Sequence, residues 1–132
     1  MEVVYDTGSD WLTIEGADCT NCGGDTYTYA DSSTFSFLEQ TQSVELEYGS
    51  ATLEGLRASD QVCITNNDKE DFSQICLASF EFFLISSMNG LDDRIDGILG
   101  LSRSSANPAL MRKAWRGIGP TYIKHLADAG VI

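Results

Sequence analysis

The stretch VVYDTGSDWL, residues 3–12, carries an apolar run into a carboxylate, a hydroxyl and a glycine. Its first three residues are strand formers, whereas Asp6 is a poor strand residue whose charge is costly to bury without partners. We therefore expect Asp6 to be held at a special place at the end of a strand. The alternative is that this carboxylate only caps its own turn, as Asp often does.

Length and charge limit the function classes. With 132 residues and 42% hydrophobic content, the chain is long enough for one domain or one lobe with a real core. Its net charge is -12, and the first 56 residues contain eleven carboxylates and no Lys or Arg. Such a surface repels phosphate and anionic lipid, which argues against nucleic-acid and membrane partners. The longest apolar run, residues 75–85, is too short for a membrane span and contains Glu81.

The hydrophobic pattern predicts a mostly β chain with a helical end. Short apolar or alternating runs separated by Gly, Asn and Asp are typical of strands and hairpins over the first 90 residues. Pro near the start and Gly at the end of two later segments are typical of helices. The expected strands are 2–6, 10–16, 43–55 as a hairpin, 60–64, 73–80 and 96–101, and the expected helices are 107–117 and 119–130.

Four cysteines, an even number, indicate an oxidising compartment. The N-terminal MEVVYDTG is no signal peptide, so we expect that the chain lacks its natural beginning. Zinc would need two more ligands near Cys19 and Cys22, and a redox CxxC should open a helix, so a small-loop disulfide fits this pair best. Cys63 and Cys76 flank a polar hairpin loop and are expected to bridge its strands. No metal or cofactor is expected.

The order of the motifs resembles the N-terminal lobe of the pepsin-like aspartic proteases. DTGS (6–9) is followed by the short Cys loop, then YADSSTF (29–35), the hairpin, DGILGLS (96–102) and a final helix. The resemblance covers nearly the whole chain. It implies a mostly β fold, with β-barrel-like sheets, a flap hairpin and short C-terminal helices. It also implies that residues 1–132 form a single lobe that lacks the first strands and the C-terminal lobe.

The resemblance gives Asp6 a catalytic role. In this family the Asp of the DTG loop shares a water molecule with a second Asp from another lobe or subunit. The pair shares a proton, so that one carboxylate acts as base toward water and the other as acid toward the peptide carbonyl. Thr7 would hydrogen-bond the opposing loop, and Gly8 would let backbone N–H groups approach the carboxylate. The Ser9 hydroxyl would bind the outer oxygen of Asp6.

The resemblance also identifies a flap and a supporting strand. Tyr48 occupies the position of the flap tyrosine, and Gly49 and Ser50 would offer backbone hydrogen bonds to a substrate peptide; otherwise Tyr48 is an ordinary strand aromatic. The strand beside the catalytic loop is expected to shape the site without doing chemistry, with Ile98 and Leu99 behind Asp6. Its residues are Asp96, Gly97, Ile98, Leu99 and Gly100.

Some positions depart from the family. Many members place a tryptophan that hydrogen-bonds the flap tyrosine where this chain has Thr13, and its own tryptophan, Trp11, lies two residues earlier. Ala51 replaces a flap glycine. A second Asp-Thr-Gly or Asp-Ser-Gly is absent from the sequence.

Three functions therefore stay open. The favoured one is an aspartic endopeptidase lobe that hydrolyses peptide bonds, secreted or lysosomal/vacuolar, whose partners are a peptide or protein substrate and a missing C-terminal lobe or second subunit. The others are a one-lobe homodimeric protease and a non-catalytic, protease-derived binding or structural subunit.

Overall fold

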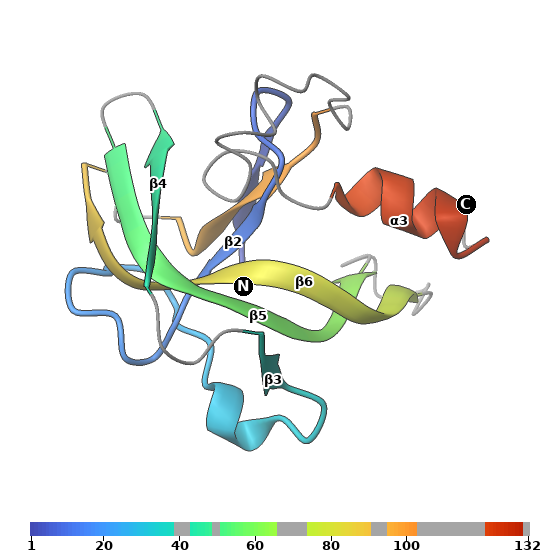
Figure 1. Cartoon of the computed structure of the whole chain (residues 1–132), viewed down its shortest axis with the longest axis horizontal. Coiled ribbons are helices and arrows are strands. Elements are labelled where there is room, and N and C mark those ends of the chain that lie inside the picture. The colour runs from blue at the N-terminus through green and yellow to red at the C-terminus, as the bar shows by residue number, and fades with distance from the viewer. Residues whose placement is uncertain (39–42, 49–50, 66–73, 91–94, 103–120, 131–132) are drawn as a thin grey trace.

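The computed structural model describes residues 1–38, 43–48, 51–65, 74–90, 95–102 and 121–130 (Figure 1). Most of the described chain is strand, which confirms the predicted mostly β class. The elements are β1 (Val3–Asp6), β2 (Leu12–Glu15), the 3-10 helix η1 (Tyr29–Asp31), β3 (Ser36–Phe37), β4 (Val44–Tyr48), β5 (Ala51–Thr65), β6 (Gln74–Asn89), β7 (Gly97–Gly100) and α3 (Tyr122–Asp128).

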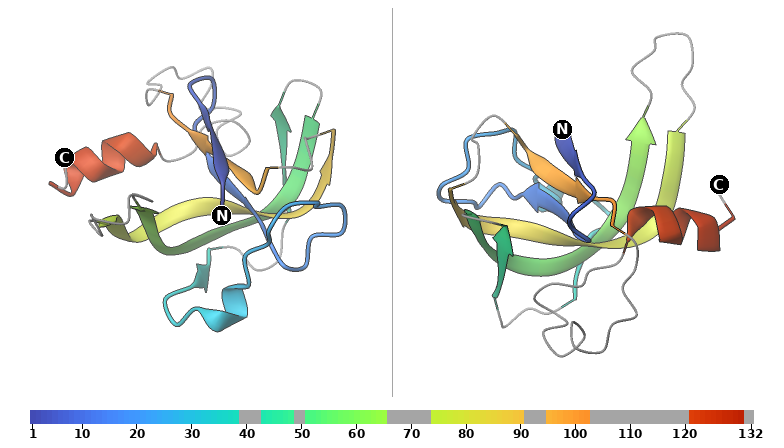
Figure 2. Two further views of the ribbon diagram at one scale, coloured as in Figure 1. Left: turned by 180° about the vertical axis from the view of Figure 1, so that it is seen from behind. Right: turned by 90° about the horizontal axis from the view of Figure 1, so that it is seen from above.

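The strands form one mixed sheet of seven strands. Their order is β1-β7-β2-β6-β5-β3, and β4 pairs with β5 outside this path. β1 runs parallel to β7 and β2 runs parallel to β6, whereas the other neighbours are antiparallel. Figure 2 shows β5 and β6 as one long curved ribbon, with the β4–β5 hairpin at one end and α3 toward the other. The small β1–β7–β2 unit rises from this ribbon and carries the DTG loop.

The second half of the predicted hairpin is longer than its sequence pattern indicated. The expected separate strands 51–55 and 60–64 are both part of β5, because Gly55 does not end a strand but marks a β-bulge, where the register shifts between Glu54 and Gly55. A Cβ at Gly55 would lie 2.0 Å from the carbonyl oxygen of Leu84 on β6. Glycine inside a strand often marks such a bulge or close approach, and bulges bend the ladder.

Two hydrophobic clusters form the core. The larger cluster lies between the β1–β7–β2 unit, β6 and α3, and its buried members are Leu12, Ala58, Leu77, Phe80, Phe82, Leu84, Leu99, Tyr122 and Leu126. The second cluster lies under the β4–β5 hairpin. It contains Trp11, Leu46, Leu53, Phe83, Ile85 and Met88, with Cys19 and Cys22 packed against it. The second cluster therefore joins the hairpin, the segment after the DTG loop and the Cys loop.

The final predicted helix forms as α3. Tyr122 and Leu126 are buried, with the ring of Tyr122 edge-on to Phe80 at 5.2 Å, whereas Ile123 is 47% exposed. Gly130 follows the helix with a φ of 72°, in the left-handed region that favours glycine after a helix end. The other predicted helix, 107–117, lies outside the described residues. No helix in the described part of the chain is long and apolar enough to cross a membrane.

The structure contains the two expected disulfides. Cys63 and Cys76 face each other directly across β5 and β6, with their Cα atoms 4.0 Å apart. Cys19 and Cys22 close a short loop between β2 and η1, with a Cα separation of 5.6 Å. Cys63–Cys76 therefore links β5 and β6 at the end of the long ribbon far from the hairpin, and Cys19–Cys22 restrains a loop beside the hairpin.

Candidate active site

Asp6 is the last residue of β1 and its side chain is half-buried. Its Oδ1 accepts a hydrogen bond of 3.0 Å from the backbone N–H of Gly8, and its carbonyl accepts one of 2.8 Å from Leu101. The chain thus turns tightly around the carboxylate. A carboxylate held by a backbone N–H in this way is pre-oriented for chemistry.

β7 supports the DTG loop from the side. Gly100 lies directly opposite Asp6 in the β1–β7 pairing, and its N–H donates to the carbonyl of Trp11 at 2.9 Å. A Cβ at Gly100 would lie 2.5 Å from the carbonyl oxygen of Ser9 and 2.4 Å from the carbonyl carbon of Asp10. Only glycine therefore lets the two backbones approach this closely.

The middle of β7 is buried behind this loop. Ile98 and Leu99 are 6% and 5% exposed, and the N–H of Ile98 donates to the hydroxyl of Thr13 at 3.1 Å. Thr13 has no exposed surface, and a Cβ at Gly97 would lie 2.0 Å from its carbonyl oxygen. Thr13, which stands where many family members have a tryptophan, thus joins β2 to β7 in this chain.

Asp96 acts at the other end of β1 from Asp6. Its two carboxylate oxygens accept hydrogen bonds of 2.6 Å from the backbone N–H groups of Glu2 and Asp25. Because Gly97 pairs with Val3, Asp96 lies before the start of the β1–β7 ladder. Asp96 holds the N-terminal segment and the segment after the Cys loop in place by binding their backbone N–H groups. Its side chain does not contact Asp6 in this way.

The β4–β5 hairpin forms with the predicted register. Tyr48 pairs with Ala51, Leu46 and Leu53 are buried in the second cluster, and the intervening Glu side chains of β4 are exposed. Gly49, Ser50 and the side chain of Tyr48 lie outside the described part of the structure. Their predicted contacts with substrate stay predictions.

The sequence matches a known protein family over almost its whole length. The family model described as eukaryotic aspartyl protease matches residues 1–128. The chain belongs to the eukaryotic aspartyl protease family. The DTG loop, the supporting β7 and the hairpin over Trp11 are thus parts of an aspartyl protease lobe.

Three curated fungal relatives give the same family. Vacuolar protease A of Arthroderma otae is 35% identical over 139 residues, which cover 97% of this chain and 33% of the relative. Probable vacuolar protease A of Trichophyton verrucosum is 31% identical over 136 residues, covering 100% of this chain and 30% of the relative. Major aspartyl peptidase 1 of Cryptococcus neoformans is 28% identical over 104 residues, covering 78% and 20%. The chain spans about a third or less of these aspartyl proteases.

One expected hydrogen bond of the aspartyl protease loop is not formed. The buried hydroxyl of Ser9 has no hydrogen-bond partner among the described residues, so the predicted bond from Ser9 to Asp6 is wrong for this structure. The Gly8 N–H binds the carboxylate instead. The Thr7 side chain is exposed, which leaves its predicted contact with an opposing loop as a prediction.

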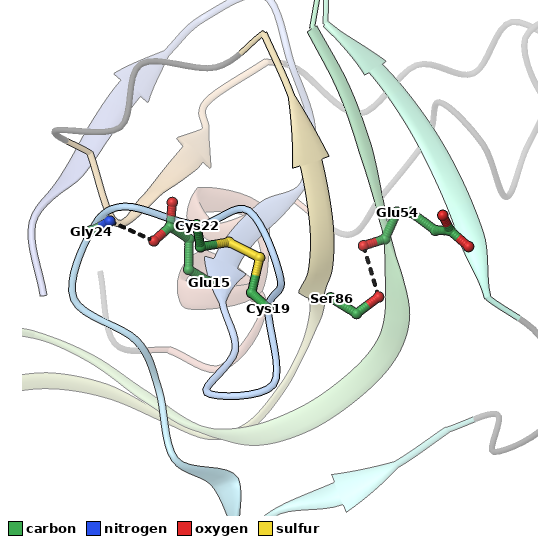
Figure 3. The surroundings of a disulfide bond; sticks show 6 residues. All are labelled: Glu15, Cys19, Cys22, Gly24, Glu54 and Ser86. Carbon is green, nitrogen blue, oxygen red and sulfur yellow. Dashed lines mark hydrogen bonds between the residues drawn. A yellow bond between two sulfur atoms is a disulfide. The ribbon is translucent and has the colours of Figure 1, made fainter.

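The Cys loop of this aspartyl protease chain is tied to the base of the hairpin (Figure 3). Glu15 accepts a 3.0 Å hydrogen bond from the Gly24 N–H, and the Thr20 N–H donates to the carbonyl of Ser86 at 3.1 Å. The Ser86 hydroxyl in turn donates to the carbonyl of Glu54 at 3.1 Å. These bonds were not predicted, although the Gly-Gly pair after the second cysteine is a sequence signal for a tight backbone approach.

A second unpredicted network surrounds Asp60 on β5. This carboxylate is 7% exposed and accepts hydrogen bonds from the hydroxyls of Tyr27, Ser32 and Thr34 and from the Gln61 N–H. The segment that carries the YADSSTF motif is thereby fastened to the long ribbon.

The Asp60 network changes two pKa values. Burial alone would raise the pKa of Asp60, but the hydrogen bonds from Thr34, Tyr27 and Ser32 outweigh burial and lower it. Burial, followed by the bond to Asp60, raises the pKa of Tyr27 to about 12. The charged form of Asp60 and the neutral form of Tyr27 are therefore favoured together in the fold.

Proposed function

We propose that this chain supplies one half of an aspartic endopeptidase active site, with Asp6 as its catalytic carboxylate. The observation that carries the proposal is the setting of Asp6. The Gly8 N–H binds its carboxylate, and Gly100 allows β7 to press against the loop behind it. The side chain is half-buried at the end of an edge strand, where a second carboxylate can approach it from outside the chain.

The reaction needs that second carboxylate. The charged member of the pair takes a proton from water, and the water oxygen attacks the peptide carbonyl carbon while the other member gives its proton to the carbonyl oxygen. The resulting diol collapses as the C–N bond breaks: one diol hydroxyl gives its proton to the carboxylate that had donated one, and the nitrogen takes up the proton held by the other carboxyl. The sequence holds a single Asp-Thr-Gly, at residues 6–8, so a C-terminal lobe or a second subunit is the proposed source of the other Asp.

The β4–β5 hairpin is the proposed flap. Its inner residues Leu46 and Leu53 pack on the cluster that contains Trp11, close in sequence to the DTG loop. A hairpin anchored at its base can close over a bound peptide and exclude water. Tyr48, Gly49 and Ser50 are the proposed substrate-contacting residues at its end.

The proposed location is a vacuole or the secretory route. Two fungal relatives are named vacuolar proteases, and two disulfides suit an oxidising compartment. The hydrogen bonds of the Asp60 network lower the pKa of that carboxyl, so Asp60 keeps its charge to a lower pH than an ordinary aspartate does. A fold braced in this way is suited to an acidic compartment.

The test is reconstitution. The purified chain is mixed with a separately produced C-terminal lobe of a two-lobed aspartic protease, and cleavage of a casein-type substrate is followed at acidic pH with and without pepstatin. We expect no pepstatin-sensitive cleavage from the chain alone and measurable cleavage from the mixture.

The other outcomes separate the alternatives. Cleavage by the chain alone that rises with the square of its concentration would indicate a homodimeric protease. Failure to cleave in both settings, by a chain that binds the added lobe, would contradict the endopeptidase role and favour a non-catalytic binding subunit.

A further inference from the structure

The β5–β6 ladder contains a bulge at the base of the β4–β5 hairpin. Glu54 of β5 pairs with Ser87 of β6. The next residue of β5, Gly55, pairs with Ile85. Ser86 is therefore an extra residue on β6, opposite no residue of β5 in the described ladder. A bulge bends its strand and can turn the side chain of the extra residue in a new direction.

The bulge lies at the junction between the hairpin and the long ribbon. On one side of it, residues 52–54 of β5 pair both with β4 and with residues 87–89 of β6. On the other side, β5 and β6 continue together as far as the Cys63–Cys76 bridge. Each segment keeps its own ladder, so a change of angle between the two segments can be absorbed at the bulge.

The side chain of Ser86 forms a hydrogen bond across this junction. Its hydroxyl donates to the carbonyl of Glu54 at 3.1 Å (Figure 3). The carboxylate of Glu54 in turn accepts a 2.9 Å hydrogen bond from the hydroxyl of Ser43, the residue before β4 begins. Glu54 thus joins the base of both hairpin strands to the bulge.

The backbone of Ser86 binds the Cys loop. Its carbonyl accepts a 3.1 Å hydrogen bond from the N–H of Thr20. Thr20 lies inside the short loop that the Cys19–Cys22 disulfide closes. Ser86 therefore contacts the Cys loop with its carbonyl and the base of the hairpin with its hydroxyl.

The Cys loop and the hairpin also meet through apolar packing. Cys19 and Cys22 pack against the second cluster, which contains Leu46 of β4 and Leu53 of β5. Leu46 and Leu53 are 2% and 0% exposed. Apolar packing has no preferred direction, whereas a hydrogen bond restricts both distance and angle. The cluster therefore holds the hairpin against the loop, and the Ser86 hydroxyl is suited to fixing its orientation.

We propose that the bulge is the hinge of the flap and that Ser86 is the positioning residue of this hinge, an inference that rests on the proposed function of the β4–β5 hairpin. The Ser86 hydroxyl sets the angle at which the hairpin leaves the ribbon. The Ser86 carbonyl couples that angle to the disulfide-bonded Cys loop. Hinge residues can lie far from the reacting groups and still change kcat and KM, because they govern how a lid closes.

The first test is amide hydrogen exchange on the purified 132-residue chain, followed residue by residue by NMR. Ser86→Ala removes the hydroxyl and keeps the backbone. We expect the amides of β4 and of residues 51–54 to exchange about three- to tenfold faster, as the loss of one hydrogen bond implies. The Thr20 amide should also exchange faster. The amides of residues 80–84, on the ribbon side of the bulge, should keep their rates.

Two further variants serve as controls. Ser79→Ala makes the same change on the ribbon part of β6, where the hydroxyl bonds with that of Ser59 at the surface, and should leave the hairpin and Thr20 rates unchanged. Ser86→Thr keeps a hydroxyl on a larger side chain and should restore the exchange rates of the wild type. Rescue by threonine would not be expected if Ser86 acted only through its small size.

The second test uses the chain completed by a separately produced C-terminal lobe. Ser86→Ala should raise KM for a peptide substrate about three- to tenfold and change kcat less, because flap contacts weaken while the carboxylates are unaltered. Ser86→Thr and Ser79→Ala should match the wild type. If the wild-type mixture does not cleave, the proposed endopeptidase function fails, and the exchange rates of the chain alone still decide whether Ser86 positions the hairpin.

Three results would overturn the proposal. Equal hairpin exchange in wild type and Ser86→Ala would show that the hydroxyl does not hold the hinge. Faster exchange by the same factor in hairpin and ribbon would make Ser86 a general contributor to stability and not a hinge residue. Faster hairpin exchange with an unchanged Thr20 amide would contradict the coupling to the Cys loop.

Discussion

Gly100 and Asp6 face each other in the parallel pairing of β1 with β7, and the absence of a side chain at Gly100 sets the position of the DTG loop. The space where a Cβ would stand is already occupied by the backbone of Ser9 and Asp10. The position of Asp6 thus depends on Gly100, a residue more than 90 positions away in the sequence.

Gly100→Ala should destabilise the fold. The added methyl group would lie 2.4–2.7 Å from backbone atoms that cannot rotate away, so strand β7 or the loop must shift. We expect a loss of about 1–3 kcal/mol in the free energy of unfolding, as for other overpacking changes. Gly8→Ala is the control, because its nearest contact would be the Asp6 carboxylate at 3.3 Å. Equal thermal midpoints for wild type and Gly100→Ala would contradict the close approach.

Asp60→Asn should weaken the fold most at neutral pH. The hydrogen bonds lower the pKa of Asp60 below its ordinary value of 3.8, so its stabilising effect is present above about pH 4 and is lost as the pH falls through the lowered pKa. The thermal midpoint of wild type should therefore fall toward that of Asp60→Asn as the pH is lowered from 6 to 2. Asp128→Asn, an exposed carboxylate on α3, serves as control and should change the profile little. A constant difference between wild type and Asp60→Asn at every pH would argue against the network.

Tyr27→Phe tests the same network from the alkaline side. The pKa of Tyr27 is raised to about 12, so the stability from its neutral hydroxyl is fully present below pH 10 and is lost as the pH rises through about 12. The variant should be less stable than wild type at pH 7, and the difference should shrink above pH 10. Tyr29→Phe is the matched control, since the Tyr29 hydroxyl binds Asp18 at the surface. A spectroscopic titration that placed Tyr27 at its ordinary pKa would refute the assignment.

The two disulfides should contribute unequally to stability. Cys63–Cys76 closes a loop with a sequence separation of 13 and Cys19–Cys22 one of 3. Loop-closure entropy then gives about 3 kcal/mol for the longer loop and about 2 kcal/mol for the shorter. Replacing each pair by serines and comparing the midpoints of urea unfolding measures the difference. A larger loss for the short loop would show that contacts of the Cys loop, and not loop closure, determine its contribution.

Much of the fold could be predicted from local pattern. The β4–β5 hairpin alternates apolar and acidic residues, and DGILGL has the apolar, glycine-flanked composition of a strand buried on both faces. The resemblance to the aspartic proteases added the pairing of DTG with that strand. The length of β5 was missed because Gly55 ends the alternating pattern although the ladder continues through a bulge.

The networks around the site could not be predicted in the same way. Asp60 binds Tyr27, Ser32 and Thr34, which lie 26 to 33 positions away. No spacing rule links such residues, because the fold alone brings the loop to the bulged strand. Asp96 was expected to shape the site as part of the strand beside the catalytic loop, and the β1–β7 register places it at the end of β1 opposite to Asp6.

Asp6→Asn separates chemistry from structure. The amide keeps the shape of the carboxylate and can still accept the Gly8 N–H, but it cannot carry the shared negative charge of a catalytic pair. In the chain completed by a second lobe or a second copy, we expect turnover to be abolished while binding of a pepstatin-like ligand is largely retained. The thermal midpoint should be unchanged or slightly higher, because a half-buried carboxylate loses its desolvation cost. Asp128→Asn, assayed in parallel, should retain full turnover. Retained cleavage in Asp6→Asn would remove Asp6 from the mechanism, and lost cleavage with a collapsed midpoint would make Asp6 a structural cap of its own turn.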